Sequence, residues 1–485
     1  MIHTGSEVEH PDFGVGRVLR ILGDTAQVDF FGESLDVAVR HLTPRGEYRA
    51  AVQSDSPAYD AEALRFRQAF EAMNLGVVPP DPSQLIDLTI GGSKAASKVQ
   101  RWLHAAPRDG LCKIFFGFYG TGKSHHLQLV KAIALKQGWV TAFLEFDPKA
   151  ADPAKPHLVY QGILNGLTFP MRENGTKTEG FFGLVKEIRD NWDLIRDGQY
   201  FHRCPWFRSA LEVLQYFPHN PDEDYVSGVG WLSGQVKAVS AIRSLAQHCG
   251  LPGRSIPLLP QIRETADIYV FLLVVLNEIC RAVGYKGLAI ILDEAEHVRG
   301  FNVRRRERAN NFFDLLARVA HPPVLGDDPP IANDYGIQVP PYWQEGPHFA
   351  LFVGLTEGDT FADPTLSLRE ACVFLHREDD RVMLSPPTPK EYCAWCESFF
   401  ARCYRHLGRG MHLLSDERNR QAISVALATA LDEQPTNERL MRIWIKLASL
   451  VPSILMCGAA DTHDNLVKLV TSAARRASGY EFPWD

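Results

Sequence analysis

The segment from Gly117 to Ser124 has the residue types and the spacing of a phosphate-binding loop. It fits the pattern G-x-x-x-x-G-K-[ST], in which glycines let successive backbone N–H groups point at phosphate oxygens. An apolar stretch precedes the loop and an amphipathic helical pattern follows it, so a helix dipole adds positive charge there. We expect Lys123 to reach the β- and γ-phosphates of ATP and Ser124 to ligate Mg²⁺. The other nucleotide-binding residues that we expect are Gly117, Gly120, Thr121, Gly122 and His125.

A second group of candidate residues follows the apolar stretch 288–292. The chain continues there as Asp-Glu-Ala-Glu, and an apolar strand that ends in Asp-Glu is the Walker-B pattern of P-loop ATPases. Asp293 would hold Mg²⁺, and Glu294 would polarise the attacking water, a role that needs a carboxylate within reach of the γ-phosphate. Glu296 has two interpretations, a second polar contact in the site or a solvated charge at a helix start.

Two further positions are candidates for contact with the γ-phosphate. Thr356 ends the apolar stretch 349–355, where AAA+ ATPases place a polar "sensor 1" residue between the phosphate and the water. Thr436 is a suitable N-cap, which would put Arg439 in the first turn of a helix. An arginine there resembles the "sensor 2" that reaches from a helical lid to the γ-phosphate, with Arg442 as the second choice. A solvated helix face is the alternative for both arginines.

The run Arg-Arg-Arg-Glu-Arg at 304–308 has three interpretations. The first is a solvated charged helix face. The second is an arginine finger that points at the ATP of a neighbouring subunit, a role for which Arg369 is a further candidate. The third is a set of phosphate contacts to DNA. The sequence leaves all three open.

A parallel sheet is the element that can bring these residues together. Four short apolar stretches predict buried strands, and helical patterns lie between them, which favours an α/β fold. The predicted strands are 113–116, 140–146, 288–292 and 349–353. The long interval at about 151–280 predicts a helical insertion between the second and third strands.

The chain divides into four stretches by pattern. Residues 1–48 predict a small β-barrel, and 49–110 predict a linker and helices that lead into the ATPase. Residues 111–384 predict an AAA+-type P-loop ATPase core. Residues 385–485 predict a helical lid, with helical periodicity as far as 455, and a short tail.

The N-terminal stretch predicts three strands, at 15–21, 26–31 and 35–39, joined by tight turns. Its pattern V-x-H-P-x-F-G-x-G-x-V from Val8 to Val18 resembles the SH3- or Tudor-like modules that are appended to some DNA helicases and transcription-coupling factors. Such modules bind protein partners or nucleic acid. The alternative is a folding cap on the next domain.

Composition limits the class of protein. The 485 residues are 45% hydrophobic and 22% charged, which is typical of globular domains and excludes a disordered chain or a fibre. The net charge of −7 gives no sign of a general nucleic-acid coat, so any polyanion site must be local.

The sequence shows no signal peptide and no apolar run of membrane-spanning length. Nine cysteines without a framework fit reduced thiols, and Cys393 and Cys396 lie in a helical pattern that favours core positions over zinc. We expect a soluble, cytoplasmic protein without a membrane partner.

The order of several segments resembles the ATP-binding proteins of BREX phage-defence systems, the BrxC/BrxD-type family. The segments are 66–80 (F-R-Q-A-F-E-A-M-N-L-G-V-V-P-P), 87–91 (D-L-T-I-G), the phosphate-binding loop, 231–234 (W-L-S-G) and 282–287 (A-V-G-Y-K-G), which runs into 292–296 (L-D-E-A-E). The resemblance implies an AAA+ ATPase related to replication initiators and encoded with a helicase-like partner. It also implies a role in defence against phage DNA.

Together these features predict an enzyme that hydrolyses ATP with Mg²⁺ and couples nucleotide state to assembly and to engagement of DNA or a helicase-like partner. Self-association is expected, because AAA+ sites are commonly completed by a neighbouring subunit. Two alternatives stay open. One is an initiator-like or helicase-loading AAA+ ATPase of replication or repair, and the other is a nucleotide-gated scaffold with little turnover.

Overall fold

The computed structural model describes most of the chain and divides into two compact units, Met1–Glu62 and Ala63–Asp485. The described residues are 2, 4, 6–10, 14–30, 33–44, 61–79, 81–147, 149–172, 175–215, 223–234, 239–250, 265–320, 339–343, 348–356, 378–408, 410–434 and 440–477.

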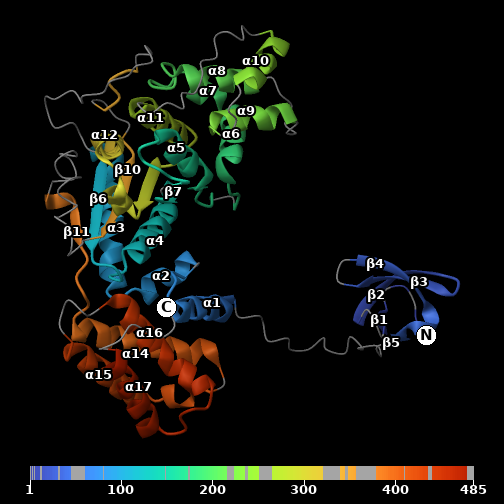
Figure 1. The fold of residues 1–485 in the computed structure, drawn as a ribbon, viewed down its shortest axis with the longest axis vertical. Helices are drawn as coiled ribbons and strands as arrows, with labels where there is room; N and C mark the ends of the chain where they lie inside the picture. Colours follow the sequence, from blue (N-terminus) through green and yellow to red (C-terminus); the bar gives the residue numbers. More distant parts are fainter. Residues whose placement is uncertain are drawn as a thin grey trace. The chain divides into compact units, whose positions relative to one another are not determined.

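The N-terminal unit is built on an antiparallel sheet of five strands in the order β4-β3-β2-β1-β5 (Figure 1). Val28 and Phe30 of β3 are buried with Val8 and Val18, and Gly16 leaves room for the Phe30 ring, which lies 2.5 Å from the position of a Cβ there. Within the described residues the strands pair in series from β4 to β5, and no pairing joins these two outer strands. The predicted closure of the sheet into a barrel is therefore not seen in the described residues. The elements are β1 (Glu7–His10), β2 (Gly14–Leu22), β3 (Thr25–Phe30), β4 (Glu33–Ala38), the turn η1 (Val39–His41) and β5 (Thr43–Pro44).

The larger unit contains the predicted parallel sheet, with strands in the order β11-β6-β10-β9-β7-β8. All neighbours pair in parallel except β8, which pairs antiparallel with β7. The strands are β6 (Leu111–Gly117), β7 (Val140–Glu145), β8 (Leu167–Thr168), β9 (Leu288–Asp293), β10 (Ala350–Thr356) and β11 (Arg381–Met383). The four predicted strands are therefore present, and the α/β class is confirmed. The pattern missed β8 and β11, because two and three residues are too few to show a period.

Helices cover both faces of this sheet. Side chains alternate between the two faces along each strand, and the strands are apolar at successive positions, so both faces must be buried. Leu288, Ile290 and Leu292 of β9 belong to one buried cluster, whereas Ala289 and Ile291 belong to the other. Helices α3 (Gly92–Asp109) and α4 (Lys123–Lys136) cover the second face, and α5 (Pro156–Asn165), α11 (Ala266–Ala282) and α12 (Val303–Ala320) cover the first (Figure 1).

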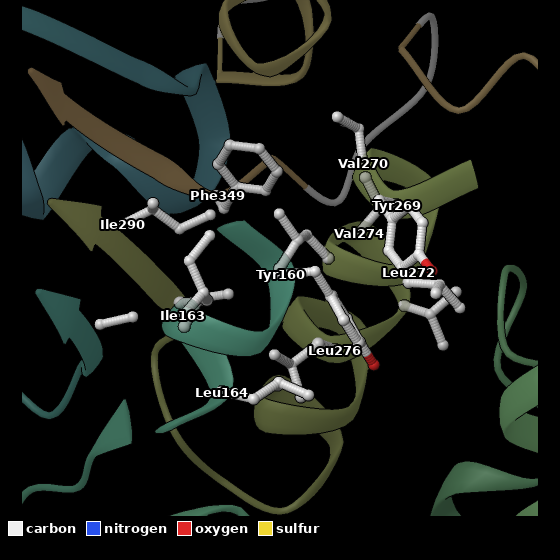
Figure 2. Close-up of a cluster of buried hydrophobic side chains, with 14 of the residues drawn as sticks. Tyr160, Ile163, Leu164, Tyr269, Val270, Leu272, Val274, Leu276, Ile290 and Phe349 are labelled. Atoms are coloured by element: carbon white, nitrogen blue, oxygen red, sulfur yellow. The ribbon is translucent and has the colours of Figure 1, made fainter. Parts of the chain in front are cut away.

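The centre of the largest core is α11. Every residue from Ala266 to Asn277 is buried, so the apolar run that begins at Ile268 belongs to a helix surrounded by protein on all sides. Figure 2 shows side chains of α11, among them Val274 and Leu276, in one buried cluster with Ile163 of α5 and Ile290 of β9. Within the described residues no helix is both long enough and apolar enough to cross a membrane.

The interval in which we expected a helical insertion, about 151–280, includes α5, the short strand β8 and most of α11. Between β8 and α11 the described helices are α6 (Gly180–Asp190), α7 (Trp192–Ile195), α8 (Pro205–Leu214), α9 (Glu223–Leu232) and α10 (Val239–His248). Trp206 and Phe207 of α8 are fully buried in the same core as α11, so the insertion extends the first face of the sheet.

The C-terminal helices form a second core that also includes the first helix of this unit. Phe66 and Phe70 of α1 pack with Phe399 of α14, although more than three hundred residues separate them in the chain. We predicted a short tail after residue 455, but the chain forms a further helix there, α17. Leu466 and Val470 of α17 are buried in this core. The helices are α1 (Ala61–Leu75), α14 (Pro389–Leu407), α15 (Glu417–Asp432), α16 (Met441–Met456) and α17 (His463–Ala477).

Short elements complete the unit. The helix α2 (Pro82–Leu88) lies between α1 and α3, the turn η3 (Ala295–Gly300) follows β9, and the turns η5 (Glu378–Asp380) and η6 (Met411–Leu414) precede β11 and follow α14. Cys396 and Cys403 of α14 are buried, as the helical pattern predicted, and burial raises the pKa of the Cys396 thiol well above its usual value.

Candidate functional site: a nucleotide pocket

The glycine-rich loop turns tightly between β6 and α4. Gly120 and Gly122 have φ angles of 80° and 90°, a region that side chains disfavour, and α4 begins at the next residue, Lys123. Gly117 must also be glycine, because a Cβ there would lie 2.4 Å from the Thr121 Oγ1 atom. The sequence therefore builds a loop whose backbone wraps around the start of a helix.

Lys123 lies inside this loop. The residue is only 7% exposed, and its Nζ donates to the carbonyl oxygens of Gly117 and Phe118, each at 3.1 Å. An ammonium group is costly to bury without partners, so the loop carbonyls hold the charge at the loop's inner side. The buried cation supplies the positive charge that a polyphosphate would require.

The acidic strand end faces the loop from two strands away. Strand β10 lies between β6 and β9, with Thr356 opposite Gly117 in the register. Asp293 ends β9 at 3% exposure, and its Oδ1 accepts the backbone N–H of Glu294 at 2.9 Å. A Cβ on Gly354 of β10 would lie 2.5 Å from the same oxygen, so glycine is needed there. The sheet thus holds Asp293 and Thr356 at one edge with the loop.

Glu294 is held in an unusual backbone conformation. It is the only non-glycine among the described residues with a positive φ, at 58°, a conformation that costs free energy and is often found at functional sites. Its pKa is raised, first by burial and then by the carboxylates of Glu296 and Asp293. Its Oε2 lies 3.9 Å from the His297 Nε2. Glu294 lines the pocket, whereas the negative charge of Glu296 raises the pKa of Glu294.

A cavity of about 310 Å³ joins the glycine-rich loop to Glu294. That volume is at the lower end of the range for small-molecule sites. Its polar lining residues are Lys123, Ser124 and Glu294, together with Thr89, Tyr119, His125, His126 and Arg442. Apolar side chains from segments far apart in sequence also line it, namely Met73, Val77, Val78, Pro79, Leu88, Ile90, Met441 and Ile445. A flat apolar group joined to a charged chain matches this mixed lining.

His125 and His126 also line the cavity and are held as neutral rings. Burial, and secondarily the neighbouring His126, lowers the pKa of His125 to about 3. Its Nε2 lies 2.6 Å from the Thr89 Oγ1, which itself donates to the Leu85 carbonyl. The His125 Nε2 must therefore carry the hydrogen and donate it to Thr89. This contact ties the start of α4 to the segment that follows α2.

The lid-like helix α16 begins against the loop. The backbone N–H of Arg442 donates to the Gly120 carbonyl at 3.2 Å, and its Nη1 donates to the Tyr119 hydroxyl at 3.1 Å. Arg442 therefore lines the pocket directly. Arg439, the preferred lid arginine from the sequence, lies outside the described residues, as do Thr436 and Arg369.

The residues that we expected to hold Mg²⁺ fit that ion. Within the described part of the chain no group of three or more His, Cys, Asp or Glu side chains could hold a metal by itself. Mg²⁺, however, is usually bound by one or two protein ligands together with phosphate oxygens and water. Ser124 at the start of α4 and the buried Asp293 carboxylate are suitable oxygen donors of that kind.

The arginines of the run at 304–308 differ in their contacts and in their exposure. The Arg305 Nη2 forms an ion pair with the Oδ2 of the buried Asp152 carboxylate at 2.9 Å, and the guanidinium lies 3.7 Å from the centre of the Phe301 ring, so Arg305 holds local structure. Arg304 is exposed.

Sequence reasoning missed the apolar half of the pocket. Val77 to Pro79 and Thr89 to Ile90 carry no chemical signal of their own, yet both segments belong to the stretches that resemble the BREX family. The sequence predicted only a linker and helices in this part of the chain. Only the fold shows that they meet across the glycine-rich loop.

Comparison with known proteins relates part of the chain to a protein family. No curated protein and no solved structure matches the chain. A family model described as "BREX system ATP-binding protein BrxC/D" matches residues 62–186 and 219–320, which include the glycine-rich loop and the strand that ends in Asp293, and stops before β10 and α14–α17. Over these two stretches the chain is similar to the BREX system ATP-binding protein BrxC/D family, and the match supports its place there.

Proposed function

We propose that this protein binds and hydrolyses ATP as an AAA+-type ATPase and that it serves in antiphage defence. The observation that carries the proposal is the convergence of the wrapped loop, the buried Lys123, Glu294 and a group of apolar side chains on one cavity, with Asp293 buried next to Glu294 at the end of β9. The family that the chain matches is described as ATP-binding and as part of the BREX system, which supports both parts.

The mixed polar and apolar lining of the cavity supports a mode of binding. The triphosphate would lie along the backbone N–H groups from Gly120 to Ser124, where the dipole of α4 favours negative charge. Adenine would then reach the apolar compartment that Val78, Ile90 and Ile445 line. The cavity has room for an adenosine group of that kind.

The proposed roles follow from position and chemistry. Lys123 would leave the loop carbonyls to contact the β- and γ-phosphates, and Ser124 and Asp293 would hold Mg²⁺, which neutralises charge on the phosphate oxygens when bound. Glu294 would orient a water molecule and take up its proton as the water attacks the γ-phosphorus and ADP leaves. Thr356, from the strand between the two motifs, would contact the water or the γ-phosphate.

The lid would report the nucleotide state. We propose that Arg442, and Arg439 from the segment just before it, contact the γ-phosphate and so change the position of α16 on the loop. The change would be passed to other copies of the chain, to a helicase-like or other defence protein, or to DNA. For the N-terminal unit we propose an SH3- or Tudor-like role in partner binding, and for the whole protein a cytoplasmic location.

Phosphate release by the purified protein tests the enzyme. We expect turnover that depends on ATP and Mg²⁺. Glu294→Gln should lower turnover by about 10²- to 10⁴-fold, the usual contribution of a general base, while ATP affinity is kept. Lys123→Ala should abolish ATP binding and leave the melting temperature nearly unchanged, because the side chain faces the loop cavity.

The same assay separates the alternatives. Absence of turnover with and without duplex DNA, together with tight ATP binding, would identify a nucleotide-gated scaffold. Turnover that a replicative helicase partner stimulates would favour the helicase-loading alternative. ATP affinity in Lys123→Ala equal to that of the parent protein would contradict the site itself.

A further inference from the structure

The arginines at the start of α12 face two directions. Successive residues of an α-helix are rotated by about 100°, so Arg308 lies between Arg304 and Arg305 around the helix axis. Arg305 is turned to the buried Asp152 carboxylate, at 2.9 Å. Arg304, by contrast, is exposed, and Arg308 is partly exposed. Asp152 does not hold Arg304, Arg306 or Arg308. Of these, Arg304 and Arg308 lie about 40° apart around the helix axis and form a pair, whereas Arg306 lies about 200° from Arg304.

The loop after β7 adds cations to this pair. Lys155 and Arg305 converge on the same Oδ2 atom of Asp152, with the Lys155 Nζ at 3.8 Å, which places the loop against α12. Lys149 is exposed in the same loop. We call Arg304, Arg308, Lys149 and Lys155 the basic surface.

The neighbouring carboxylates offset part of this charge. Asp152 is fully buried and pairs with Lys155 and Arg305. Asp147 is exposed, and the backbone N–H groups of Lys149 and Ala150 lower its pKa, which keeps it ionised. Glu307 is exposed beside Arg308 on the helix. In a chain with a net charge of −7, this grouping is a local excess of positive charge.

The chemistry of the basic surface favours phosphate over an acidic protein. Protein interfaces depend on buried apolar or aromatic anchors, whereas phosphate backbones are bound mainly by arginine and lysine side chains. Val303, at 60% exposure, is a small aliphatic residue beside the pair and a weak anchor. Arginine and lysine side chains on two adjoining elements provide contacts to successive phosphates.

We propose that the basic surface binds the phosphate backbone of duplex DNA. The proposal names the surface for the DNA engagement that is part of the proposed function, but it does not depend on ATP hydrolysis. Each phosphate contact contributes about 0.9 to the slope of the logarithm of the binding constant against the logarithm of salt concentration. Four contacts would give a slope of about −3.6.

Fluorescence anisotropy of a short labelled duplex, titrated with the full chain without nucleotide, tests the proposal. The salt concentration is varied from about 50 to about 200 mM. The double variant Arg304→Gln with Arg308→Gln should bind more weakly, with a slope smaller in magnitude by about 2. The matched control replaces Lys98 and Arg101, two exposed cations of α3, by glutamine and should keep the parent slope.

Three results would overturn the proposal. They are an unchanged slope in the Arg304 and Arg308 variant, an equal loss in the α3 control, and competition by poly-glutamate as strong as by unlabelled duplex at equal charge, which would identify an acidic protein as the partner. ATP binding is measured on the same variants. Because the basic surface is separate from the cavity, its affinity for ATP should not change, and a failure of the proposed ATPase would be visible apart from a failure of DNA binding.

Discussion

At the scale of the residue, the site depends on close approach as much as on charged groups. Asp293 is buried beside β10, and its Oδ1 occupies the space that a side chain on Gly354 would fill. Glu294 follows in a strained backbone conformation that turns its carboxylate into the cavity. The position of the Asp293 carboxylate therefore depends on the absence of a side chain at Gly354.

The variant Gly354→Ala tests this point. Its Cβ would lie 2.5 Å from Asp293 Oδ1, so the carboxylate must move. We expect the Mg²⁺ concentration that supports ATP binding or turnover to rise by about tenfold or more, and a stability loss of about 1–3 kcal/mol from overpacking. Mg²⁺ titration and chemical denaturation measure the two effects. Gly300→Ala is the control, because nothing lies within 4 Å of a Cβ there; an equal Mg²⁺ effect in both variants would contradict the argument.

At the scale of the element, two helices meet the glycine-rich loop in different ways. Helix α4 grows out of the loop in sequence, whereas α16 comes from the C-terminal core and touches the loop through Arg442 and Gly120. Because α1 shares that core, the segment after α1 and the start of α16 reach the pocket from the same body. The C-terminal helices thus supply one wall of the cavity.

Arg442→Ala should weaken ATP binding by about 10- to 100-fold. The guanidinium bonds Tyr119 at the mouth of the pocket and is a cation in reach of a bound triphosphate, and a charge-assisted hydrogen bond of this kind contributes about 1.5–3 kcal/mol. Isothermal titration with a non-hydrolysable analogue gives the dissociation constant. Arg405→Ala, an exposed arginine at the end of α14, is the control and should bind as the parent does. If Arg442→Ala bound ATP normally, α16 would not be a lid over the phosphates.

The start of α14 predicts a pH dependence of stability. Thr388 and Glu391 form a capping box, and the hydrogen bonds from the Thr388 hydroxyl and backbone N–H lower the pKa of Glu391. A lowered pKa means that the contribution is fully present above the ordinary glutamate value of about 4.3 and is lost as pH falls through the folded-state value. Glu391→Gln should therefore lower the melting temperature at pH 7, and the difference should shrink at about pH 3. If the difference in melting temperature between Glu391→Gln and the parent protein did not change with pH, the charge of Glu391 would not be its cause.

At the scale of the whole molecule, the sequence predicted the parts that have a period or a chemical motif. The four central strands and the loop from Gly117 to Ser124 follow from apolar runs and glycine spacing. The two edge strands were too short to show a pattern. The long-range contacts of α1 with α14, and of Val77 to Pro79 with α16, were not predictable because they join segments that are hundreds of residues apart.

The division into two units gives a last prediction. The buried cluster of the N-terminal unit contains residues from Val8 to Leu42, and the described clusters of the larger unit begin at Phe66, so the described residues share no core across residue 62. A chain that begins at Ala61 should therefore fold by itself, with ATP affinity and basal turnover within about twofold of the full chain. Circular dichroism, a thermal melt and the phosphate-release assay check this, with the full chain measured in parallel. Aggregation of the shortened chain would show that the N-terminal sheet is part of the ATPase fold, whereas a loss confined to partner or DNA binding would assign that sheet to recognition.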